Sequence, residues 1–141
     1  MYNEHVIAAV VPAHNEAAHI ADVVAGLPDL VDHIVVVDDA SSDETAAIAE
    51  RAGDPRVVLI RHEQNTGVGG AIVSGHRRAL ELGADIHVIF AGDDQMDPTY
   101  LPALLDPITE EGYGFTKANR FYSSTSFQGM PTYRVIGNVL L

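Results

Sequence analysis

The amino-acid sequence predicts an α/β protein with an open, mostly parallel sheet that is covered by helices on both faces. Three observations predict this class. Short, continuous apolar segments recur along the chain, as expected for strands buried on both faces of a parallel sheet. Segments with helical spacing lie between them, and the connections are short. No internal repeat, linker or low-complexity tract interrupts the 141 residues, so we expect a single domain over residues 1–141.

The first two strand–helix units are predicted from the apolar segments and from the turn and capping residues between them. Residues 6–11 form a continuous apolar run and are predicted to be the first strand. Asn15 follows a proline-containing turn and is a candidate N-cap for a helix that ends at Gly26. Residues 34–37 are the second predicted strand. Residues 41–44, SSDE, have the spacing of a capping box and predict a second helix.

The second half of the chain continues the alternation. Residues 57–60 are the third predicted strand, and the glycine-rich residues 65–70 lead into a helix that ends near Gly83. Residues 86–90 are the fourth strand, and a helix is expected from about residue 99 to residue 111. The remaining expectations are a fifth strand at 114–118, a loop at 120–131 and the start of a helix at 133–141.

Composition excludes several classes of function. The net charge of −12, with 20 acidic against 8 basic residues, repels nucleic acid, so no nucleic-acid partner is expected. The absence of cysteine excludes disulfides and thiolate metal sites. No apolar run approaches the ~20 residues that span a bilayer, and the first residues carry no basic segment typical of a signal peptide. We therefore expect a cytoplasmic location.

The most informative stretch is residues 84–98, ADIHVIFAGDDQMDP, where a buried strand runs out into carboxylates. If residues 91–97 stay extended, Asp93 and Gln95 point to one side and Asp94 points to the other. A carboxylate and an amide oxygen on one side are a plausible half-site for Mg²⁺ or Mn²⁺, completed by water and substrate phosphates. The alternative is a solvated turn after the strand.

Other motifs point to less specific roles. The glycine run at 67–70 lacks the Gly-Lys-Ser/Thr ending of a phosphate loop, and Ile72 stands where a dinucleotide fingerprint needs its third glycine. We expect these glycines to permit close backbone packing at a helix start near the ligand. The histidines show no paired metal spacing, and Ser74 lacks a nucleophile-elbow pattern. Three histidines are expected to be tolerated at strand edges, namely His5, His33 and His62.

Polar groups follow three of the predicted strands. Residues 12–16 follow the first strand, Asp38 and Asp39 follow the second, and Asp93 with Gln95 follows the fourth. Because the carboxyl ends of parallel strands meet at one edge of the sheet, these groups should lie close together. The sequence therefore predicts a functional cleft at that edge.

A set of stretches in this order resembles the family 2 inverting glycosyltransferases of the GT-A (Rossmann-like) fold. The stretches are PAHNE, IVVVDDASSDET, NTGVGGAIVSGHRRAL, AGDDQMDP, KANRF and MPTYRVIGN. Within that family the chain is most similar to the polyprenyl-phosphate and dolichyl-phosphate hexose transferases. It departs from them at Ala91, where many members carry the first Asp of Asp-x-Asp, and at His14, where Tyr is more common. Such enzymes normally continue further, so we expect this catalytic domain to be incomplete at its C-terminus.

The resemblance implies a role for each matching residue. Asp93 would be the metal-binding acid of the Asp-x-Asp motif, and Gln95 would be a second ligand of the cation. Arg120 and Arg134 match arginines that face the acceptor phosphate in such enzymes. The residues implied in nucleotide binding are Pro12, His14, Glu16, Asp39 and Gly92.

The resemblance also implies an activity, which is transfer of a hexose from a UDP- or GDP-sugar to a polyprenyl or dolichyl phosphate with inversion. A divalent cation, Mg²⁺ or Mn²⁺, would neutralise the charge that develops on the diphosphate. A phosphate acceptor needs no general base, because its dianion is already present near neutral pH. Membrane contact would come only through the lipid acceptor or through segments beyond residue 141, at the cytoplasmic face.

Two other functions remain open at this point. A family 2 transferase acting on a saccharide hydroxyl would need a positioned acidic base near the acceptor site. A non-catalytic nucleotide-binding fragment is the second alternative, and Ala91 and the end of the chain at Leu141 support it. A nucleotidyltransferase shares the sheet, but its glycine-rich loop should follow the first strand, and here it follows the third.

Overall fold

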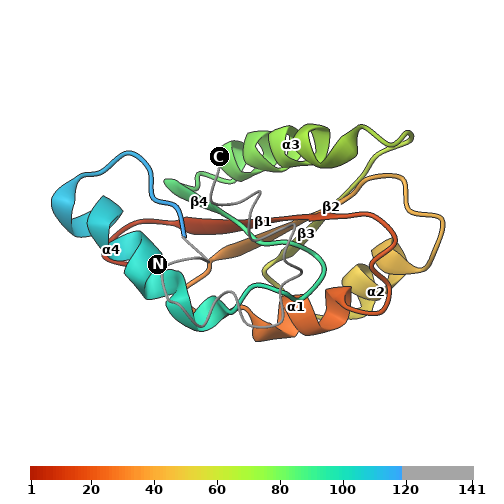
Figure 1. Ribbon diagram of the computed structural model, residues 1–141, viewed down its shortest axis with the longest axis horizontal. Helices are drawn as coiled ribbons and strands as arrows, with labels where there is room; N and C mark the ends of the chain where they lie inside the picture. The colour runs from red at the N-terminus through yellow and green to blue at the C-terminus, as the bar shows by residue number, and fades with distance from the viewer. Residues whose placement is uncertain (119–141) are drawn as a thin grey trace, which may run out of the picture. The chain divides into compact units, whose positions relative to one another are not determined.

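The structure, a computed structural model, describes residues 1–118 of the chain (Figure 1). The chain divides into two compact units, Met1–Leu101 and Pro102–Leu141. In chain order the elements are β1 (Ile7–Ala13), α1 (Ile20–Gly26), β2 (His33–Asp38), α2 (Thr45–Arg51), β3 (Val57–Arg61), α3 (Gly67–Glu81), β4 (Ile86–Ile89), the 3₁₀ turn η1 (Pro98–Tyr100) and α4 (Leu101–Glu111). The expected single domain over residues 1–141 stays a prediction.

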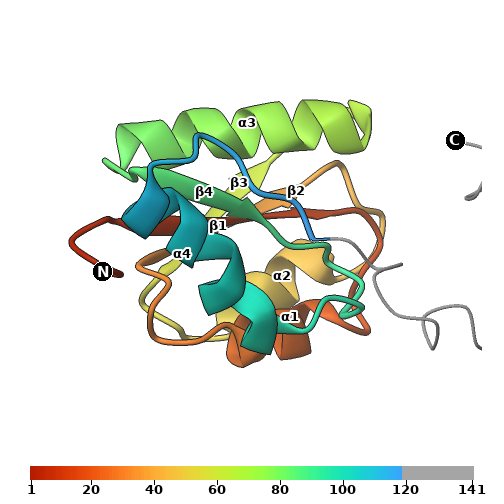
Figure 2. The ribbon, with the colours of Figure 1, turned by 60° about the vertical axis from the view of Figure 1, so that its left-hand side comes forward.

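The four strands form one parallel sheet in the order β3-β2-β1-β4. Val10 of β1 lies opposite Val35 of β2 and Ile89 of β4, so β1 is central. Figures 1 and 2 show α3 on one face of this sheet and α1 with α2 on the other. The predicted open parallel sheet with helices on both faces is therefore confirmed.

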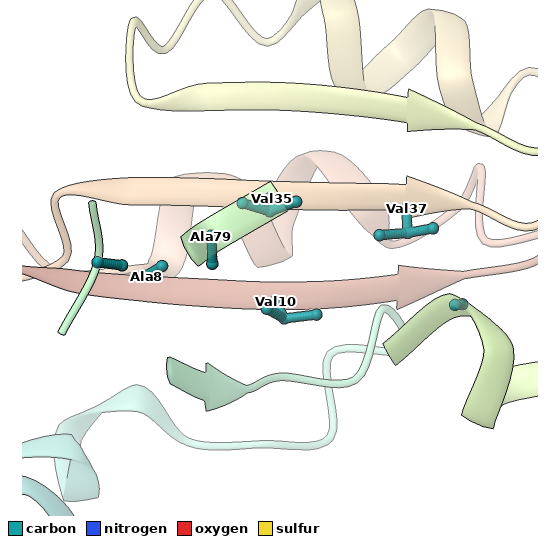
Figure 3. Close-up of a cluster of buried hydrophobic side chains, with 7 residues drawn as sticks. Ala8, Val10, Val35, Val37 and Ala79 are labelled. Carbon is teal, nitrogen blue, oxygen red and sulfur yellow. The ribbon is translucent and has the colours of Figure 1, made fainter. Parts of the chain in front are cut away.

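The core is built from the two central strands, whose residues are apolar almost throughout because both of their faces are covered. Figure 3 shows Ala8 and Val10 of β1 with Val35 and Val37 of β2, gathered beneath Ala79 of α3. All five side chains are fully buried. The small alanine lets the helix approach the valines closely, and burying each valine contributes about 1.5–3 kcal/mol.

Gly75 is the point of closest approach between α3 and the sheet. A Cβ atom built at Gly75 would lie 2.3 Å from Cγ1 of Val10 and 3.2 Å from Cγ2 of Val37. We predict that Gly75→Ala lowers the free energy of unfolding by about 1–2 kcal/mol, because overpacking outweighs the gain in helix propensity. Denaturant unfolding followed by circular dichroism measures the loss.

Gly69 provides the matched control in the same helix. A Cβ atom at Gly69 would meet nothing within 4 Å. Gly69→Ala should therefore leave stability unchanged or raise it by up to about 1 kcal/mol. Equal effects of the two substitutions would contradict close packing at Gly75.

Two predicted helix caps are wrong in detail. Helix α1 begins at Ile20 with His19 as its N-cap, and Asn15 lies further upstream with a φ of 57°. Helix α2 has Glu44 at its N-cap position and no capping hydrogen bond from a side chain. The polar side chains of both segments instead bind the neighbouring loop, as described below, and this tertiary use replaces the local caps that their spacing predicts.

The expected fifth strand is also wrong, because residues 114–118 have no strand assignment. Phe115 is the only large apolar side chain among them and is 78% exposed, so the segment has no apolar face to bury. In the second unit, the Thr116 hydroxyl donates to the Leu104 carbonyl of α4 at 2.8 Å. The predicted loop at 120–131 and helix at 133–141 lie outside the described residues.

Within residues 1–118, none of the helices has the length and apolar character needed to cross a membrane.

Candidate functional site

A cleft of about 310 Å³ opens at the carboxyl edge of the sheet. Its lining comes from the ends of β1, β2 and β4 and from the start of α3. The lining residues are Pro12, Ala13, His14, Glu16, Asp39, Asn65, Gly67, Val68, Ala71, Ala91, Gly92 and Asp93. The predicted meeting of polar groups from three strands at one edge is therefore confirmed for the segment 12–16, Asp39 and Asp93, whereas Asp38 and Gln95 do not line the cleft. The volume of the cleft is at the lower end of the range of small-molecule sites.

Backbone pairing at the strand ends brings these groups together. The Asp39 amide donates to the Ala13 carbonyl at 2.9 Å, and the Phe90 amide donates to the Val10 carbonyl at 2.9 Å. A Cβ atom at Gly92 would lie 3.1 Å from the Pro12 carbonyl oxygen and 3.2 Å from the Ala13 Cβ. Glycine therefore allows the segment after β4 to lie directly against the end of β1.

The loops after β1 and β2 are joined by hydrogen bonds that involve Asn15. Its Oδ1 accepts from the Ser42 amide at 2.8 Å, and its own amide donates to the Ser41 hydroxyl at 2.9 Å. The next amide, that of Glu16, donates to the buried Thr45 hydroxyl at 2.8 Å. Asparagine tolerates the left-handed backbone of this turn better than most residues do. These bonds fix the segment that carries the cleft residues His14 and Glu16.

His14 and Asp39 are also joined to each other. Nδ1 of His14 lies 2.9 Å from the Asp39 carbonyl oxygen, so this nitrogen carries the proton and donates. Nε2 is then free to accept, and the Asn15 side-chain amide lies 3.2 Å away. The imidazole therefore spans the two loops at the mouth of the cleft.

Asp39 is the most deeply buried acid of the cleft, with a side chain that is 4% exposed. Its Oδ1 accepts from the Thr66 amide and the Thr66 hydroxyl, both at 2.9 Å. His62 approaches the same oxygen with Nδ1 at 2.6 Å. Burial alone would raise the pKa of Asp39, but the hydrogen bonds from Thr66 and His62 outweigh it and hold that pKa below its ordinary value. The site thus contains a buried, ionised acceptor.

The segment after β4 is a turn, so the expected extended conformation of residues 91–97 is wrong. Oδ1 of Asp93 accepts from the Gln95 amide at 3.2 Å, and Asp94 has a φ of 57°. Short carboxylate side chains favour such local turns over extended backbone. Asp93 nevertheless lines the main cleft, whereas Asp94 lines a separate, much smaller hollow. Gln95 is exposed and does not line the cleft, and its role as a metal ligand stays a prediction.

The donor set for a cation is partial. Among the described residues, no three His, Asp or Glu side chains are grouped so that they could hold a metal ion. Asp93 can offer one carboxylate in the cleft. That donor set fits Mg²⁺ or Mn²⁺ only if substrate phosphates and water complete the coordination shell, which is a common arrangement for Mg²⁺.

Several lining residues come from the start of α3, where the sequence analysis predicted close packing. Gly67 has a φ of 76° and, like Gly69, open space where a Cβ would stand, so that expectation is wrong for both. Close packing is present at Gly70, where an added Cβ would collide with the side chain of the N-cap residue, and the glycine that packs against the sheet is Gly75. Gly67 instead provides the left-handed turn that opens the helix. Asn65 supports this turn by accepting from the Gly67 amide at 2.9 Å. Glycine is needed at position 67 for its left-handed backbone conformation and not for close packing.

His62 is also more than a tolerated strand-edge residue, because it contacts the buried Asp39. Its backbone amide donates to the Asp38 carbonyl at 2.9 Å and so continues the pairing of β3 with β2. No local pattern in the sequence indicates this contact, because 23 positions separate the two side chains. Arg120 and Arg134, predicted to face an acceptor phosphate, lie outside the described residues.

The fold and the cleft together define a doubly wound α/β protein that is built to bind a ligand at the carboxyl edge of its sheet. Residues 8–137 match the family described as "Glycosyl transferase family 2". The chain belongs to this family, which confirms the resemblance seen in its motifs.

The curated relatives include two glycosyltransferases whose names contain a lipid phosphate. The UDP-N-acetylglucosamine–dolichyl-phosphate N-acetylglucosaminyltransferase of Methanococcus voltae is 34% identical over 92% of this chain and 58% of its own length. The undecaprenyl-phosphate mannosyltransferase of Micrococcus luteus is 35% identical over 70% of this chain and 42% of its own length. The chain thus spans about half the length of the curated relatives that it matches.

Solved structures of a related enzyme share the fold. Glucosyl-3-phosphoglycerate synthase from Mycobacterium tuberculosis, in complex with Mn²⁺, UDP-glucose and phosphoglyceric acid, superposes with a TM-score of 0.62 at 28% identity. The match covers 76% of this chain and 40% of that enzyme. The expected GT-A type of α/β fold is thereby confirmed.

Proposed function

We propose that this chain forms the donor-binding part of a glycosyltransferase that binds a nucleoside-diphosphate hexose and transfers the hexose to a polyprenyl or dolichyl phosphate with inversion. The observation that carries the proposal is the composition of the cleft. Six residues predicted from sequence to bind nucleotide or metal line it together, namely Pro12, His14, Glu16, Asp39, Gly92 and Asp93. They come from the ends of three different strands.

A uridine nucleotide is the donor that we favour over a guanosine nucleotide. The relative from Methanococcus voltae is named for a UDP-sugar, and the mycobacterial synthase is solved with UDP-glucose. The buried carboxylate of Asp39 suits the ring N–H of uracil, which needs an acceptor. Guanine also presents a ring N–H, so binding must be compared directly for UDP and GDP.

The transfer is a single displacement. An oxygen of the acceptor phosphate forms a bond to the anomeric carbon, while the bond from that carbon to the donor's diphosphate oxygen breaks and the nucleoside diphosphate leaves. When bound, the divalent cation supplies neutralising charge for the departing diphosphate. Asp93 would be the carboxylate ligand of the cation, and Gln95 is the proposed second ligand. Arg120 and Arg134 are the residues that we propose bind the acceptor phosphate, because a guanidinium can form forked hydrogen bonds to a phosphate.

The location that fits this activity is the cytoplasmic face of a membrane, with peripheral contact through the lipid acceptor. The names of the relatives from Methanococcus voltae and Micrococcus luteus support a lipid phosphate as acceptor. The net charge of −12 disfavours general attraction to anionic headgroups, so contact would depend on the acceptor itself.

Titration calorimetry with UDP, GDP and their hexose conjugates, with and without Mn²⁺, tests donor binding. Transfer is measured with the full-length protein, a radiolabelled nucleotide sugar and polyprenyl phosphate in detergent. Labelled lipid is the expected product. Binding without transfer to any acceptor would favour a non-catalytic nucleotide-binding protein, and transfer to a saccharide alone would favour a hydroxyl acceptor.

Asp39→Asn should weaken nucleotide binding by about 1–3 kcal/mol, because the amide cannot accept from Thr66, His62 and the base as a carboxylate does. Asp22→Asn is the matched control, since Asp22 is exposed on α1 and does not line the cleft. Calorimetry gives the affinities, and circular dichroism checks that both variants are folded. Unchanged affinity in a folded Asp39→Asn variant would remove this residue from the site.

A further inference from the structure

Three side chains, those of Asp39, His62 and Ser74, are joined by hydrogen bonds that lead from the cleft to helix α3. Nδ1 of His62 lies 2.6 Å from Oδ1 of Asp39, and Nε2 of the same ring lies 2.9 Å from the Ser74 hydroxyl. The His62 side chain is 15% exposed and that of Asp39 is 4% exposed. Only Asp39 among the three lines the cleft. The other two therefore act on a bound ligand through Asp39.

The chemistry of the three groups fixes the direction of the hydrogen bonds. An ionised carboxylate only accepts, so the proton between Asp39 and His62 is on Nδ1 of the ring. In a neutral imidazole Nε2 is then a bare acceptor, and the Ser74 hydroxyl must donate to it. Ser74 thus favours the one tautomer of His62 that can donate to Asp39.

The two oxygens of the Asp39 carboxylate have unequal partners. Oδ1 accepts from His62, from the Thr66 amide and from the Thr66 hydroxyl. Oδ2 has a single longer contact with the Thr66 amide, at 3.1 Å. Oδ2 has fewer donors than Oδ1, so it retains capacity to accept a hydrogen bond from a ligand.

Serine hydrolases also contain hydrogen-bonded Asp, His and Ser side chains. In this protein the environment of Ser74 excludes a role as nucleophile. Ser74 lies inside α3, where backbone amides are engaged within the helix and cannot form an oxyanion hole. Neither Ser74 nor His62 lines the cleft, so no substrate carbonyl placed there meets the hydroxyl.

We propose that His62 and Ser74 are positioning residues for base recognition. His62, oriented by Ser74, binds Oδ1 of Asp39 and leaves Oδ2 for a base that carries a ring N–H, which selects uridine over cytidine nucleotides. Uracil presents N3–H to that oxygen, whereas cytosine presents a lone pair that the carboxylate repels. The inference rests on the proposed function, because it assumes that a nucleotide occupies the cleft.

Two substitutions of His62 separate positioning from packing. The amide nitrogen of asparagine takes nearly the place of Nδ1 and can still donate to Asp39, whereas the longer glutamine places its amide near Nε2 and reaches Ser74 instead. We expect His62→Gln to lower the ratio of UDP to CDP affinity by about tenfold or more, and His62→Asn to keep it within about threefold. Calorimetry with both nucleotides gives the ratio. An equal loss of thermal stability in both variants, with the ratio unchanged in both, would reduce His62 to a structural residue and overturn the proposal.

Ser74 is tested in the same way, with Ser74→Ala against Ser74→Thr. The threonine retains the hydroxyl and should retain the selectivity, whereas the alanine should lose part of it. Labelling of Ser74 by a fluorophosphonate would show a nucleophilic serine and contradict a positioning role.

Nitrogen-15 NMR of the His62 imidazole tests these two hydrogen bonds in the protein without nucleotide. At pH 8 we expect the His62 ring to carry its proton on Nδ1, and a proton on Nε2 would overturn the proposal. If the wild-type protein bound no nucleoside diphosphate, the proposed function would fail, and the ring tautomer would still decide whether His62 donates to Asp39.

Discussion

Asp93→Asn is expected to abolish Mn²⁺-dependent binding of UDP. Asp93 is the carboxylate that the segment after β4 contributes to the cleft, and even with Gln95 as a second ligand a cation at this site must draw most of its ligands from phosphates and water. The neutral amide binds hard cations poorly but keeps an oxygen that accepts from the Gln95 amide, so the local turn should survive. We expect the UDP affinity of the variant to be the same with and without Mn²⁺.

Asp94→Asn is the matched control, because it removes the same charge from the neighbouring residue. Asp94 lines a separate hollow rather than the main cleft, and asparagine tolerates its left-handed backbone. This variant should retain the Mn²⁺ enhancement that the wild-type protein shows. Equal losses in the two variants would mean that general negative charge, and not Asp93 itself, attracts the cation.

The wild-type protein should also bind Mn²⁺ far more weakly alone than together with UDP. The physical reason is the partial donor set, since no group of three acidic or histidine side chains suited to a metal exists within residues 1–118. Titration of Mn²⁺ with and without UDP, followed by electron paramagnetic resonance, measures the difference. Tight binding of Mn²⁺ alone would indicate protein ligands beyond those of the cleft.

Replacing both Arg120 and Arg134 with alanine is expected to lower transfer to polyprenyl phosphate by at least about 100-fold, because each guanidinium would supply charge-assisted hydrogen bonds to the acceptor. Binding of the nucleotide sugar should stay nearly unchanged, since the described residues that line the donor cleft, Asp39 and Asp93 among them, are all retained. Lysine should restore little activity, because a point charge cannot form the forked contact. The measurement is labelled lipid formed by the full-length protein.

Arg77→Ala controls for the loss of positive charge from a chain that carries only 8 basic residues. Arg77 is exposed in the C-terminal half of α3 and does not line the cleft. This variant should transfer hexose at the wild-type rate. Full activity in the Arg120, Arg134 double variant would show that the acceptor phosphate is held elsewhere, and the lipid-phosphate acceptor would lose its main support.

The sequence by itself determined the four strands, the helices that alternate with them and the edge at which the site forms. Continuous apolar runs as short and as rich in β-branched residues as residues 34–37 are typical of strands buried on both faces, and the spacing of the segments between them is helical. Since parallel strands end at a common edge, acids at positions 39 and 93 had to meet there. The strands and the position of the site follow from the order and polarity of the residues, because a short apolar segment indicates a buried strand and parallel strands all end at the same edge.

The tertiary structure alone decided which polar groups contact one another. Asn15 and Ser41 carry helix-cap signals, yet the Asn15 amide donates to the Ser41 hydroxyl across two loops. His62 has the pattern of an ordinary strand-edge histidine, yet it joins Asp39 to Ser74. A polar side chain takes whichever partner has the best geometry, and the register of the sheet can bring a distant residue closer than a neighbour in sequence. Local spacing therefore predicts where a polar group is placed, and the packed fold determines what it binds.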